Sequence, residues 1–377
     1  MSIKTLSKKM LAIVAAGAMT LGLAMPTSVF AAEGDTTTTK ATEAYISKTF
    51  NTEVGKDETF SFKAEQVGGN TENVTIPDIS FSATDTGTKT KRAQISFPNW
   101  TDAGKYEYTV TETAATPEIT DVAHQKMIMS QAEYTMDVYV SNVGNKLEIS
   151  NIIVNKKKGD NGNAETGKVN IGNTDENGFK FTNTYVQEAG TGTDPTDPDP
   201  TYKTDGSLNV TKAINAPEGS IDSNATFNFT AKFVFPTGTD ANTLGGVKGA
   251  DGNKITINED GTYNFTLKAN GKMKLTGVPV GTQISVVESA TPNYKGSAES
   301  VFNGVSQTKK EATKYNEAIT VENILGQKQN KVDVTNTYNY VPTTGIIMNT
   351  LPYVLMIALC GAALMAFVAF KRRRLQK

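Results

Sequence analysis

FTNTY at 181–185 and VTNTY at 334–338 are nearly the same five residues, present twice in one chain. In a β-strand, side chains of one parity point to one face of the sheet. Each asparagine therefore shares a face with the apolar residue two positions before it and with the tyrosine two positions after it. The pattern predicts two strands that direct Asn183 and Asn336 into an apolar interior.

Composition indicates an all-β protein that uses no disulfides. The middle of the chain is rich in Thr, Asn, Gly and Val, in short alternating runs with no long helical pattern. The single cysteine, Cys360, lies in a C-terminal apolar stretch, so disulfides and an internal Cys–Gln thioester are excluded from the exported part. The single histidine, His124, argues against a Ser-His-Asp hydrolase and a His-rich zinc site. We expect no cofactor and no metal, and the net charge of −2 gives no reason to expect nucleic acid as a partner.

The N-terminal residues 1–31 have the pattern of a secretory signal peptide. Lysines precede an apolar run from Met10 to Met25, and small residues follow up to Ala31, where we expect cleavage. An uncleaved anchor is the alternative, which is disfavoured because the apolar run is short and Pro26 follows it. The pattern predicts an exported protein.

The C-terminal residues 341–377 contain three parts in order. The first is the motif VPTTG, made of Val341, Pro342, Thr343, Thr344 and Gly345. A long apolar stretch follows it and predicts a transmembrane helix over 346–370. The last part, KRRRLQK, is basic and should stay in the cytoplasm. We therefore expect the exported chain to be anchored transiently in the membrane by its tail.

Residues 188–203, EAGTGTDPTDPDPTYK, separate two longer segments of the chain. Prolines, threonines and aspartates dominate this stretch, which predicts an extended linker with almost nothing to bury. Its aspartates could suggest a calcium site. The spacing of an EF-hand is not present, however, and a solvated spacer is the favoured interpretation.

Three landmarks recur in the same order on either side of this linker. YISKTF, VTETAATP and FTNTY in the first segment correspond to NVTKAI, VVESATP and VTNTY in the second. Such a repeat indicates two copies of one fold. We expect two tandem immunoglobulin-like β-sandwiches, over 41–187 and 204–340, each made of two packed sheets.

Strand parity places one lysine, one glutamate and one asparagine inside each domain. The two triads are Lys48, Glu112 and Asn183, and Lys212, Glu288 and Asn336. Lysine and glutamate are rarely buried unpaired, because an isolated buried charge is very costly. One interpretation is therefore a buried Lys–Glu salt bridge with the asparagine as a hydrogen-bond partner.

The other interpretation of the triads is chemical. Burial lowers the pKa of a lysine and raises that of a glutamate. The neutral amine is then a nucleophile that can attack the asparagine amide carbon, while the protonated glutamate hydrogen-bonds the asparagine carbonyl and relays the proton. Ammonia leaves, a Lys–Asn isopeptide bond remains, and the folded core supplies the proximity that the reaction needs. Two triads with the same strand order favour this interpretation.

These residues resemble a known family, the Gram-positive backbone pilins of the streptococcal T-antigen type, built from CnaB-like domains. GKYEYTVTE at 104–112 is similar to the family's glutamate segment, as is LTGVPVGTQISVVE at 275–288, although Val278 and Ile284 replace the usual leucine and tyrosine. The resemblance covers roughly 41–345. It implies that Glu112 and Glu288 catalyse two isopeptide bonds, Lys48–Asn183 and Lys212–Asn336.

The VPTTG motif resembles a sortase sorting signal of the LPXTG type, with Val341 in place of the leucine. The resemblance implies cleavage between Thr344 and Gly345 and transfer of Thr344 by a sortase. A coincidental Pro-Thr-Gly turn before a plain membrane anchor is the alternative. We favour the sorting signal because of its position directly before an apolar span and a basic tail.

The acceptor of Thr344 decides the function. A lysine on the next copy would make the chain a polymerised pilus subunit, with sortase, neighbouring copies, minor pilins and peptidoglycan as partners. The candidate acceptors are Lys180 and Lys168, with Lys156, Lys157 and Lys158 behind them. Transfer to peptidoglycan would instead give a wall-anchored monomeric adhesin. Both functions place the protein on the surface of a Gram-positive bacterium. A turnover enzyme is disfavoured, since each triad acts once, on its own domain.

Overall fold

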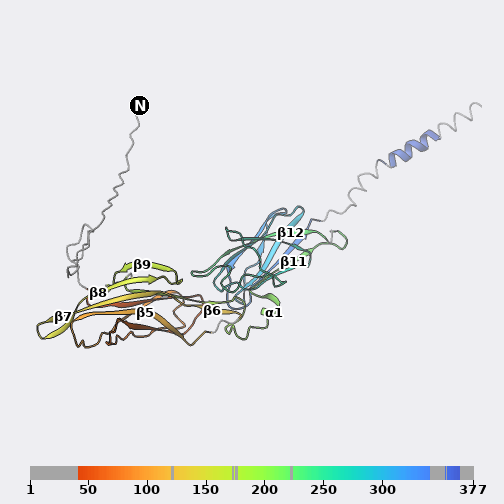
Figure 1. The fold of residues 1–377 in the computed structure, drawn as a ribbon. Helices are drawn as coiled ribbons and strands as arrows, with labels where there is room; N and C mark the ends of the chain where they lie inside the picture. Colours follow the sequence, from red (N-terminus) through yellow and green to blue (C-terminus); the bar gives the residue numbers. More distant parts are fainter. Residues whose placement is uncertain are drawn as a thin grey trace, which may run out of the picture. The chain divides into compact units, whose positions relative to one another are not determined.

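The computed structural model shows two β-sandwiches, each made of two sheets, as the sequence predicts (Figure 1). The signal peptide with Ala31 and the VPTTG motif lie outside the described residues. Over 353 and 355–365, part of the expected membrane span, the chain is helical. A search of the described residues finds no helix that is both long and apolar enough to cross a membrane. The structure describes residues 41–119, 123–171, 174, 177–220, 224–339, 353 and 355–365.

The first sandwich contains strands β1 to β10. One sheet has the order β4-β1-β10-β6, and the other has the order β3-β2-β5-β7-β8-β9. Figure 1 shows β7, β8 and β9 side by side in the second of these sheets. The strands are β1 (Tyr45–Thr52), β2 (Glu58–Val67), β3 (Ile79–Phe81), β4 (Gly87–Gln94), β5 (Gly104–Thr116), β6 (Gln125–Ile128), β7 (Glu133–Val143), β8 (Lys146–Lys158), β9 (Ala164–Val169) and β10 (Phe179–Gln187).

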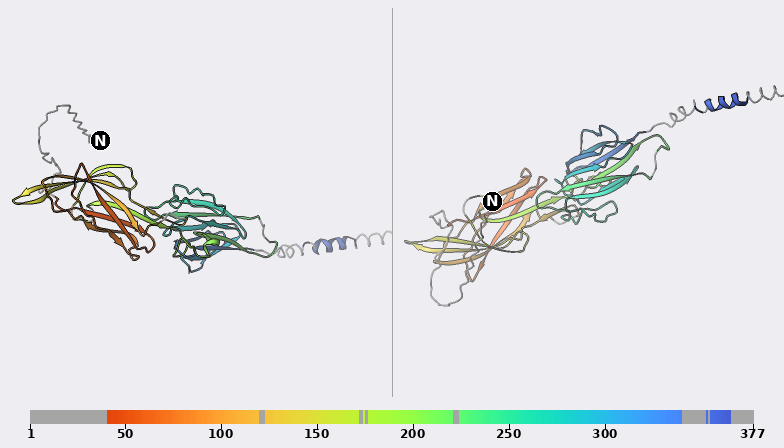
Figure 2. Two further views of the ribbon diagram at one scale, coloured as in Figure 1. Left: turned by 60° about the horizontal axis from the view of Figure 1, so that its bottom comes forward. Right: turned by 90° about the horizontal axis from the view of Figure 1, so that it is seen from above.

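The second sandwich repeats this plan, and its strands are the green to blue arrows of Figure 2. One sheet has the order β14-β11-β20-β16-β17, with β18 also paired to β16, and the other has the order β13-β12-β15-β19. The elements are α1 (Tyr202–Asp205), β11 (Leu208–Asn215), β12 (Thr226–Val234), β13 (Thr262–Lys268), β14 (Lys272–Leu275), β15 (Gln283–Glu288), β16 (Tyr294–Phe302), β17 (Val305–Ser306), β18 (Lys310–Glu311), β19 (Ile319–Ile324) and β20 (Lys331–Tyr338).

The first and last strands of each sandwich are parallel neighbours. β1 pairs with β10, and the register sets Lys48 opposite Phe181 and Phe50 opposite Asn183. β11 pairs with β20 in the same way, with Lys212 opposite Val334. Residues of one parity share a face, so in each domain the lysine and the asparagine lie diagonally across two adjacent strands. This register brings together residues from opposite ends of the domain.

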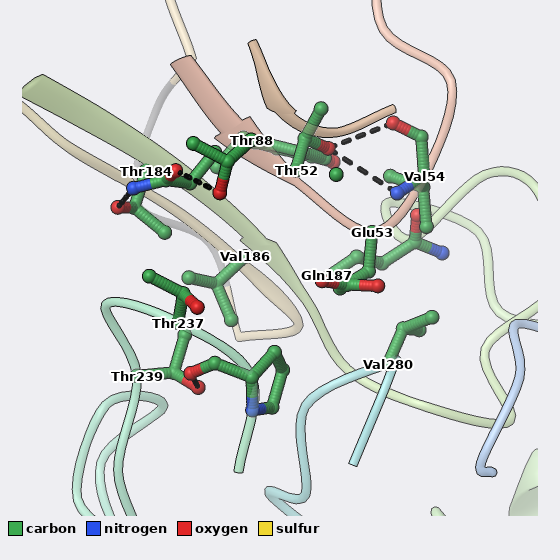
Figure 3. A pocket seen from close by; sticks show the side chains of 14 residues that line it. Thr52, Glu53, Val54, Thr88, Thr184, Val186, Gln187, Thr237, Thr239 and Val280 are labelled. Carbon is green, nitrogen blue, oxygen red and sulfur yellow. Dashed lines mark hydrogen bonds between the residues drawn. The ribbon is translucent and has the colours of Figure 1, made fainter. Parts of the chain in front are cut away.

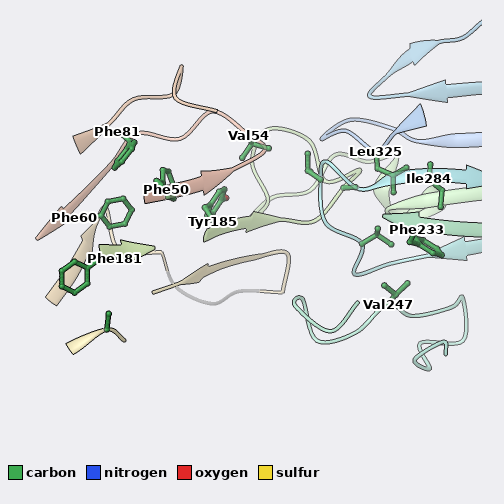
Figure 4. Close-up of a cluster of buried hydrophobic side chains, with 14 of the residues drawn as sticks. Phe50, Val54, Phe60, Phe81, Phe181, Tyr185, Phe233, Val247, Ile284 and Leu325 are labelled. Carbon is green, nitrogen blue, oxygen red and sulfur yellow. The ribbon is translucent and has the colours of Figure 1, made fainter. Parts of the chain in front are cut away.

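Aromatic rings fill the interior around the first of these strand pairs (Figure 4). Phe50 on β1 lies between Phe60 and Phe81, with ring centroids 5.2 and 5.4 Å away. Edge-to-face and tilted contacts of this kind add to the free energy gained by burying the rings. In the second sandwich, Phe233 and Ile284 are buried in the same manner. The triads therefore lie in closely packed apolar cores.

The prediction of a solvated linker is wrong for its first residues. Glu188 is only 2% exposed, and its carboxylate accepts hydrogen bonds from the Tyr202 hydroxyl at 2.6 Å and the Ser207 hydroxyl at 2.7 Å. The Nδ1 atom of His124 lies 2.7 Å from its other oxygen. Burial opposes ionisation, but these hydrogen bonds together hold the pKa of Glu188 below its ordinary value. Composition alone does not show whether a carboxylate is solvated or is buried with enough hydrogen-bond donors around it. The sequence therefore did not predict the burial of Glu188.

The backbone of this linker segment is also hydrogen-bonded to loops of the second sandwich. The Ala189 N–H donates to the Val278 carbonyl at 2.9 Å, and the Gly190 N–H donates to the Gly326 carbonyl at 3.0 Å. The linker then ends in the short helix α1, which an extended chain would not contain. The boundaries of the linker and of the two domains remain a prediction from the sequence.

Glu58 is a second buried carboxylate, and its surroundings differ from those of Glu188. It begins β2, shares the inward face with Phe60, and is 2% exposed. Neither of its side-chain oxygens has a hydrogen-bond partner in the part of the chain that the structure describes. Burial raises the pKa of Glu58 from its ordinary value of 4.5 to about 7, although the charge of Lys56 opposes this shift. The folded domain therefore holds Glu58 in its protonated form in mildly acidic solution.

We expect this carboxyl to make stability depend on pH. Between its ordinary pKa and 7 the unfolded chain loses the proton that the folded chain keeps, so stability falls as pH rises through this window. The full penalty, about 3 kcal/mol above pH 7, follows from 1.36 kcal/mol per pKa unit. Glu58→Gln should remove this decrease, so its midpoint of thermal unfolding should exceed that of the wild type increasingly from pH 5 to 8.

The exposed Glu118 provides the matched control. Glu118→Gln should follow the wild type at every pH. Parallel curves for Glu58→Gln and the wild type would mean that Glu58 is ionised in the folded protein.

Candidate functional site

The structure brings the first predicted triad together in the core of the first sandwich. Lys48 comes from the middle of β1, Glu112 from β5 in the facing sheet, and Asn183 from β10. The Lys48 Nζ atom lies 2.8 Å from each carboxylate oxygen of Glu112. The Asn183 Nδ2 atom donates to Glu112 Oε1 at 2.7 Å. The side chains of Lys48 and Glu112 are 0% exposed, so water does not compete for these contacts.

The second predicted triad repeats this arrangement between β11, β15 and β20. The Lys212 Nζ atom lies 3.0 Å from Glu288 Oε1 and 3.1 Å from Glu288 Oε2. The Asn336 Nδ2 atom donates to Glu288 Oε1 at 2.6 Å. All three residues are buried. In both domains the glutamate contacts the amine and the amide at the same time. It contacts the amide nitrogen, so the prediction of a hydrogen bond from the glutamate to the asparagine carbonyl is wrong.

In each lysine–glutamate pair, burial shifts both pKa values in the direction that favours the neutral form of the side chain. It lowers the pKa of Lys48 and of Lys212 to about 8, although the neighbouring glutamate acts in the opposite direction. Burial likewise raises the pKa of Glu112 and of Glu288, against the charge of the lysine. Desolvation outweighs the attraction between opposite charges in each case. Both shifts lower the free-energy cost of moving a proton from the amine to the carboxylate.

An aromatic ring lies against each buried amine. The Lys48 Nζ atom is 4.2 Å from the centre of the Phe60 ring, and the Lys212 Nζ atom is 4.4 Å from that of Phe227. The rings supply an apolar wall that excludes water and hold the amine close to the glutamate. These phenylalanines belong to TFSF and TFNF, two sequence segments that correspond between the domains.

The geometry fits both interpretations of the triads. A buried salt bridge with an amide partner has these contacts, and so does the arrangement that precedes attack of the amine on the amide. The reactive interpretation additionally requires the leaving nitrogen to lie beside its proton donor, and both sites meet this requirement. In each domain the Nδ2 atom, which would leave as ammonia, is the atom hydrogen-bonded to the glutamate that would protonate it.

Three residues near the first triad were not predicted from the sequence. The backbone N–H of Ser130 donates to Asn183 Oδ1 at 2.7 Å. The Met129 sulfur lies 3.2 Å from Asn183 Nδ2. Asp160 accepts hydrogen bonds from the Ser130 hydroxyl and from the N–H of Thr182. Ser130 acts through its backbone, which leaves no signature in the sequence.

The candidate acceptor lysines lie together at a surface groove. Lys156 on β8, Lys168 on β9 and Lys180 on β10 all line a groove of about 290 Å³. The Lys156 Nζ atom is 2.9 Å from Glu165, which also lines the groove. Lys180 is exposed and lies on the same strand as Asn183. Lys157 and Lys158 do not line this groove, and Lys158 pairs with Glu133 at 2.6 Å.

A second hollow, at the ends of β1 and β10, is too small for an organic ligand (Figure 3). Its volume is about 10 Å³, which is about enough for one water molecule. The Thr52 hydroxyl, which lines it, is already hydrogen-bonded to the backbone of Val54. A search of the described residues for a group of three or more His, Cys, Asp or Glu side chains that could hold a metal found none.

Comparison with known families agrees with this site. Residues 44–186 match the FctA family model, described as a Spy0128-like isopeptide containing domain. Residues 206–338 match a family described only as a domain of unknown function. None of the curated proteins matches the chain.

Several solved structures are similar to the chain at low identity. The major pilin protein T3.2 of Streptococcus pyogenes is 18% identical over 79% of this chain and 99% of its own, with a TM-score of 0.32. Another major pilin structure from Streptococcus pyogenes is 19% identical over 78% of this chain and 98% of its own, with a TM-score of 0.31. The pilus-presented adhesin Spy0125 (Cpa) is 10% identical over 78% and 99%, with a TM-score of 0.27. Similarity at this level does not establish a shared function by itself.

The family model covers the strands that carry the first triad, from β1 to β10. The first sandwich therefore matches the Spy0128-like isopeptide-containing family, and the predicted resemblance to Gram-positive pilins with isopeptide-forming domains is confirmed. The second triad lies in the region that matches a family of unknown function, so its role rests on its geometry.

Proposed function

We propose that this protein is a structural subunit of a covalently polymerised pilus on the surface of a Gram-positive bacterium. Each of its two domains forms one Lys–Asn isopeptide bond without an external enzyme. The observation that carries the proposal is the contact of each buried amine with a glutamate that also holds the asparagine amide. The match of the first sandwich to an isopeptide-containing domain supports it.

The reaction needs only the three side chains of each triad. The neutral Lys48 amine forms a bond from Nζ to the Asn183 Cγ atom, and the Cγ–Nδ2 bond breaks. Glu112 contacts both nitrogens, so it can take the surplus proton from Nζ and deliver it to Nδ2. Nδ2 leaves as ammonia. Lys212, Asn336 and Glu288 perform the same steps in the second domain. Each glutamate is regenerated, and each domain reacts once.

The bonds have a mechanical consequence. Each one joins the first strand of a domain to its last strand and closes a loop of more than a hundred residues. By analogy with a disulfide, closing such a loop stabilises the domain by about 5 kcal/mol. Tension applied between the ends of the domain would pass through the covalent bond, and the hydrogen bonds of the sheet would not carry it.

The sorting signal connects the subunits in this proposal. A sortase cleaves between Thr344 and Gly345 and transfers Thr344 to a lysine of the next copy. Minor pilins and peptidoglycan are further acceptors or partners. Lys180 is the favoured acceptor, because it is exposed at the lysine-lined groove, whereas Lys156 there is engaged by Glu165. Lys168 lines the same groove and is the second candidate.

A wall-anchored adhesin is the second candidate function. It would use the same self-cross-linked domains, but Thr344 would be transferred to peptidoglycan. The two functions differ in the acceptor alone, so the state of the protein in wall extracts distinguishes them.

The internal bonds predict a loss of mass. The purified exported region should be lighter than its sequence by two ammonia molecules, and peptide mapping should find Lys48 joined to Asn183 and Lys212 joined to Asn336. Glu112→Ala and Glu288→Ala should each restore one ammonia, because the proton relay is lost. Intact-mass spectrometry measures this directly.

Glutamates outside the triads provide controls on the two sandwiches. Glu107→Ala on β5 and Glu322→Ala on β19 should keep both losses of mass. A wild-type protein with its full sequence mass would establish the buried salt bridge as the correct interpretation of the triads.

Polymerisation predicts a ladder of high-mass species when wall extracts are separated in denaturing gels. Lys180→Arg keeps the positive charge but cannot form the amide bond, so the ladder should disappear. Lys168→Arg should leave it intact. Loss of the ladder in Lys168→Arg alone would make Lys168 the acceptor, and a single anchored band in the wild type would favour the adhesin.

A further inference from the structure

The two triads differ at the carbonyl oxygen of the reacting amide. In the first domain, Asn183 Oδ1 accepts the backbone N–H of Ser130 at 2.7 Å. In the second domain, Asn336 Oδ1 is buried and has no hydrogen-bond partner among the residues that the structure describes. The lysine, the glutamate and the leaving nitrogen are arranged alike in both. The carbonyl oxygen is the atom that gains negative charge during the reaction, so the difference at this atom bears directly on the rate.

Attack of an amine on an amide carbon moves a pair of electrons onto the carbonyl oxygen. The tetrahedral intermediate then carries an oxyanion at Oδ1 until the Cγ–Nδ2 bond breaks. In a site without water, only fixed donors can stabilise that charge. A short N–H···O contact of 2.7 Å has the length that such a donor needs.

The donor in the first domain is held in place before the reaction. Ser130 lies in the turn between β6 and β7 and is 7% exposed. Its hydroxyl donates to Asp160 Oδ1 at 2.5 Å, and the Ala132 N–H donates to that hydroxyl at 3.2 Å. The same Asp160 oxygen accepts the N–H of Thr182, the neighbour of Asn183 on β10. The turn is thus tied to the strand that carries the reacting amide.

The corresponding oxygen in the second domain faces apolar groups. Gly296 on β16 lies directly opposite Asn336 in the register of β20. A β-carbon added at Gly296 would lie 3.3 Å from Asn336 Oδ1 and 3.3 Å from the side chain of Ile319. The oxygen therefore lies beside the α-carbon of a glycine, which cannot stabilise an oxyanion as an N–H donor does.

We propose that the backbone N–H of Ser130 is the oxyanion donor for the Lys48–Asn183 bond, and that the Lys212–Asn336 bond forms much more slowly because its site has no equivalent donor. This inference rests on the proposed isopeptide chemistry and extends it. Removal of one oxyanion donor from an enzyme lowers the rate by about 10² to 10³. We expect a difference of this order between the two domains of one chain.

The test compares two variants at one position during refolding of the full exported region. Ser130→Ala loses the hydroxyl and keeps the N–H, whereas Ser130→Pro loses both. Unreacted, denatured chains are diluted into refolding buffer and quenched in acid at intervals. Mass spectrometry of the intact protein and of its peptides gives the rate of each ammonia loss separately, and near-ultraviolet circular dichroism confirms folding.

In the wild type, the Lys48–Asn183 bond should form about 10² to 10³ times faster than the Lys212–Asn336 bond. Ser130→Pro should slow the first bond to about the rate of the second, and Ser130→Ala should slow it far less. Neither variant should change the rate of the second bond, which serves as an internal reference.

Equal rates for the two bonds in the wild type would overturn the proposal, and this comparison needs no variant to fold. Equal rates in folded Ser130→Pro and Ser130→Ala would overturn it as well, while the isopeptide chemistry would remain. A wild type that loses no ammonia would instead refute the proposed function itself.

Discussion

The parallel pairing of the first and last strands is the constraint on which both domains depend. Parallel neighbours cannot be joined by a short turn. In each domain, all the remaining strands lie between these two in the sequence. The register of β1 with β10, and of β11 with β20, sets a lysine diagonally opposite an asparagine. Because these residues come from opposite ends of a domain, and the glutamate comes from the facing sheet, the three meet only when the domain has folded. Completion of the fold is therefore the condition for the chemistry.

Burial destabilises the charged forms of the lysine and the glutamate, and it thereby favours the proposed isopeptide reaction. Removing an ion from water costs several kcal/mol, and a buried pair recovers this cost only when its geometry and hydrogen bonding are good. The same cost lowers the pKa values of Lys48 and Lys212 to about 8. An isopeptide bond replaces the amine with an uncharged amide and leaves a neutral acid beside it. The folded core thus favours the product, in which no charge has to be buried.

The sequence predicts the fold class and both triads because these follow from regular strands, in which parity is reliable over several residues. Lys48, Glu112 and Asn183 all lie within continuous strands, as do their counterparts in the second domain. The features that it does not predict depend on turns and on tertiary contacts. Ser130 contributes a backbone N–H, which every residue except proline possesses. Glu188 looks like part of a solvated linker until Tyr202 and Ser207 are folded against it. The lysine-lined groove forms only because the ends of β8 and β9 lie near the start of β10, which belongs to the other sheet.

The position of the acceptor gives the two internal bonds different mechanical roles. Lys180 lies on β10, the strand that carries Asn183 and continues directly into the linker. With Lys180 as acceptor, tension enters β10 and leaves through the linker without crossing the Lys48–Asn183 bond. In the second domain the same tension enters at β11 and must reach β20 to continue toward Thr344. The proposed Lys212–Asn336 bond would be the shortest covalent path between those strands and would carry the load. The proposed first bond would only hold β1 against a strand that is already under tension. The slower of the two reactions would then be the one that makes the fibre inextensible, and a newly joined subunit would strengthen with time after it has been added.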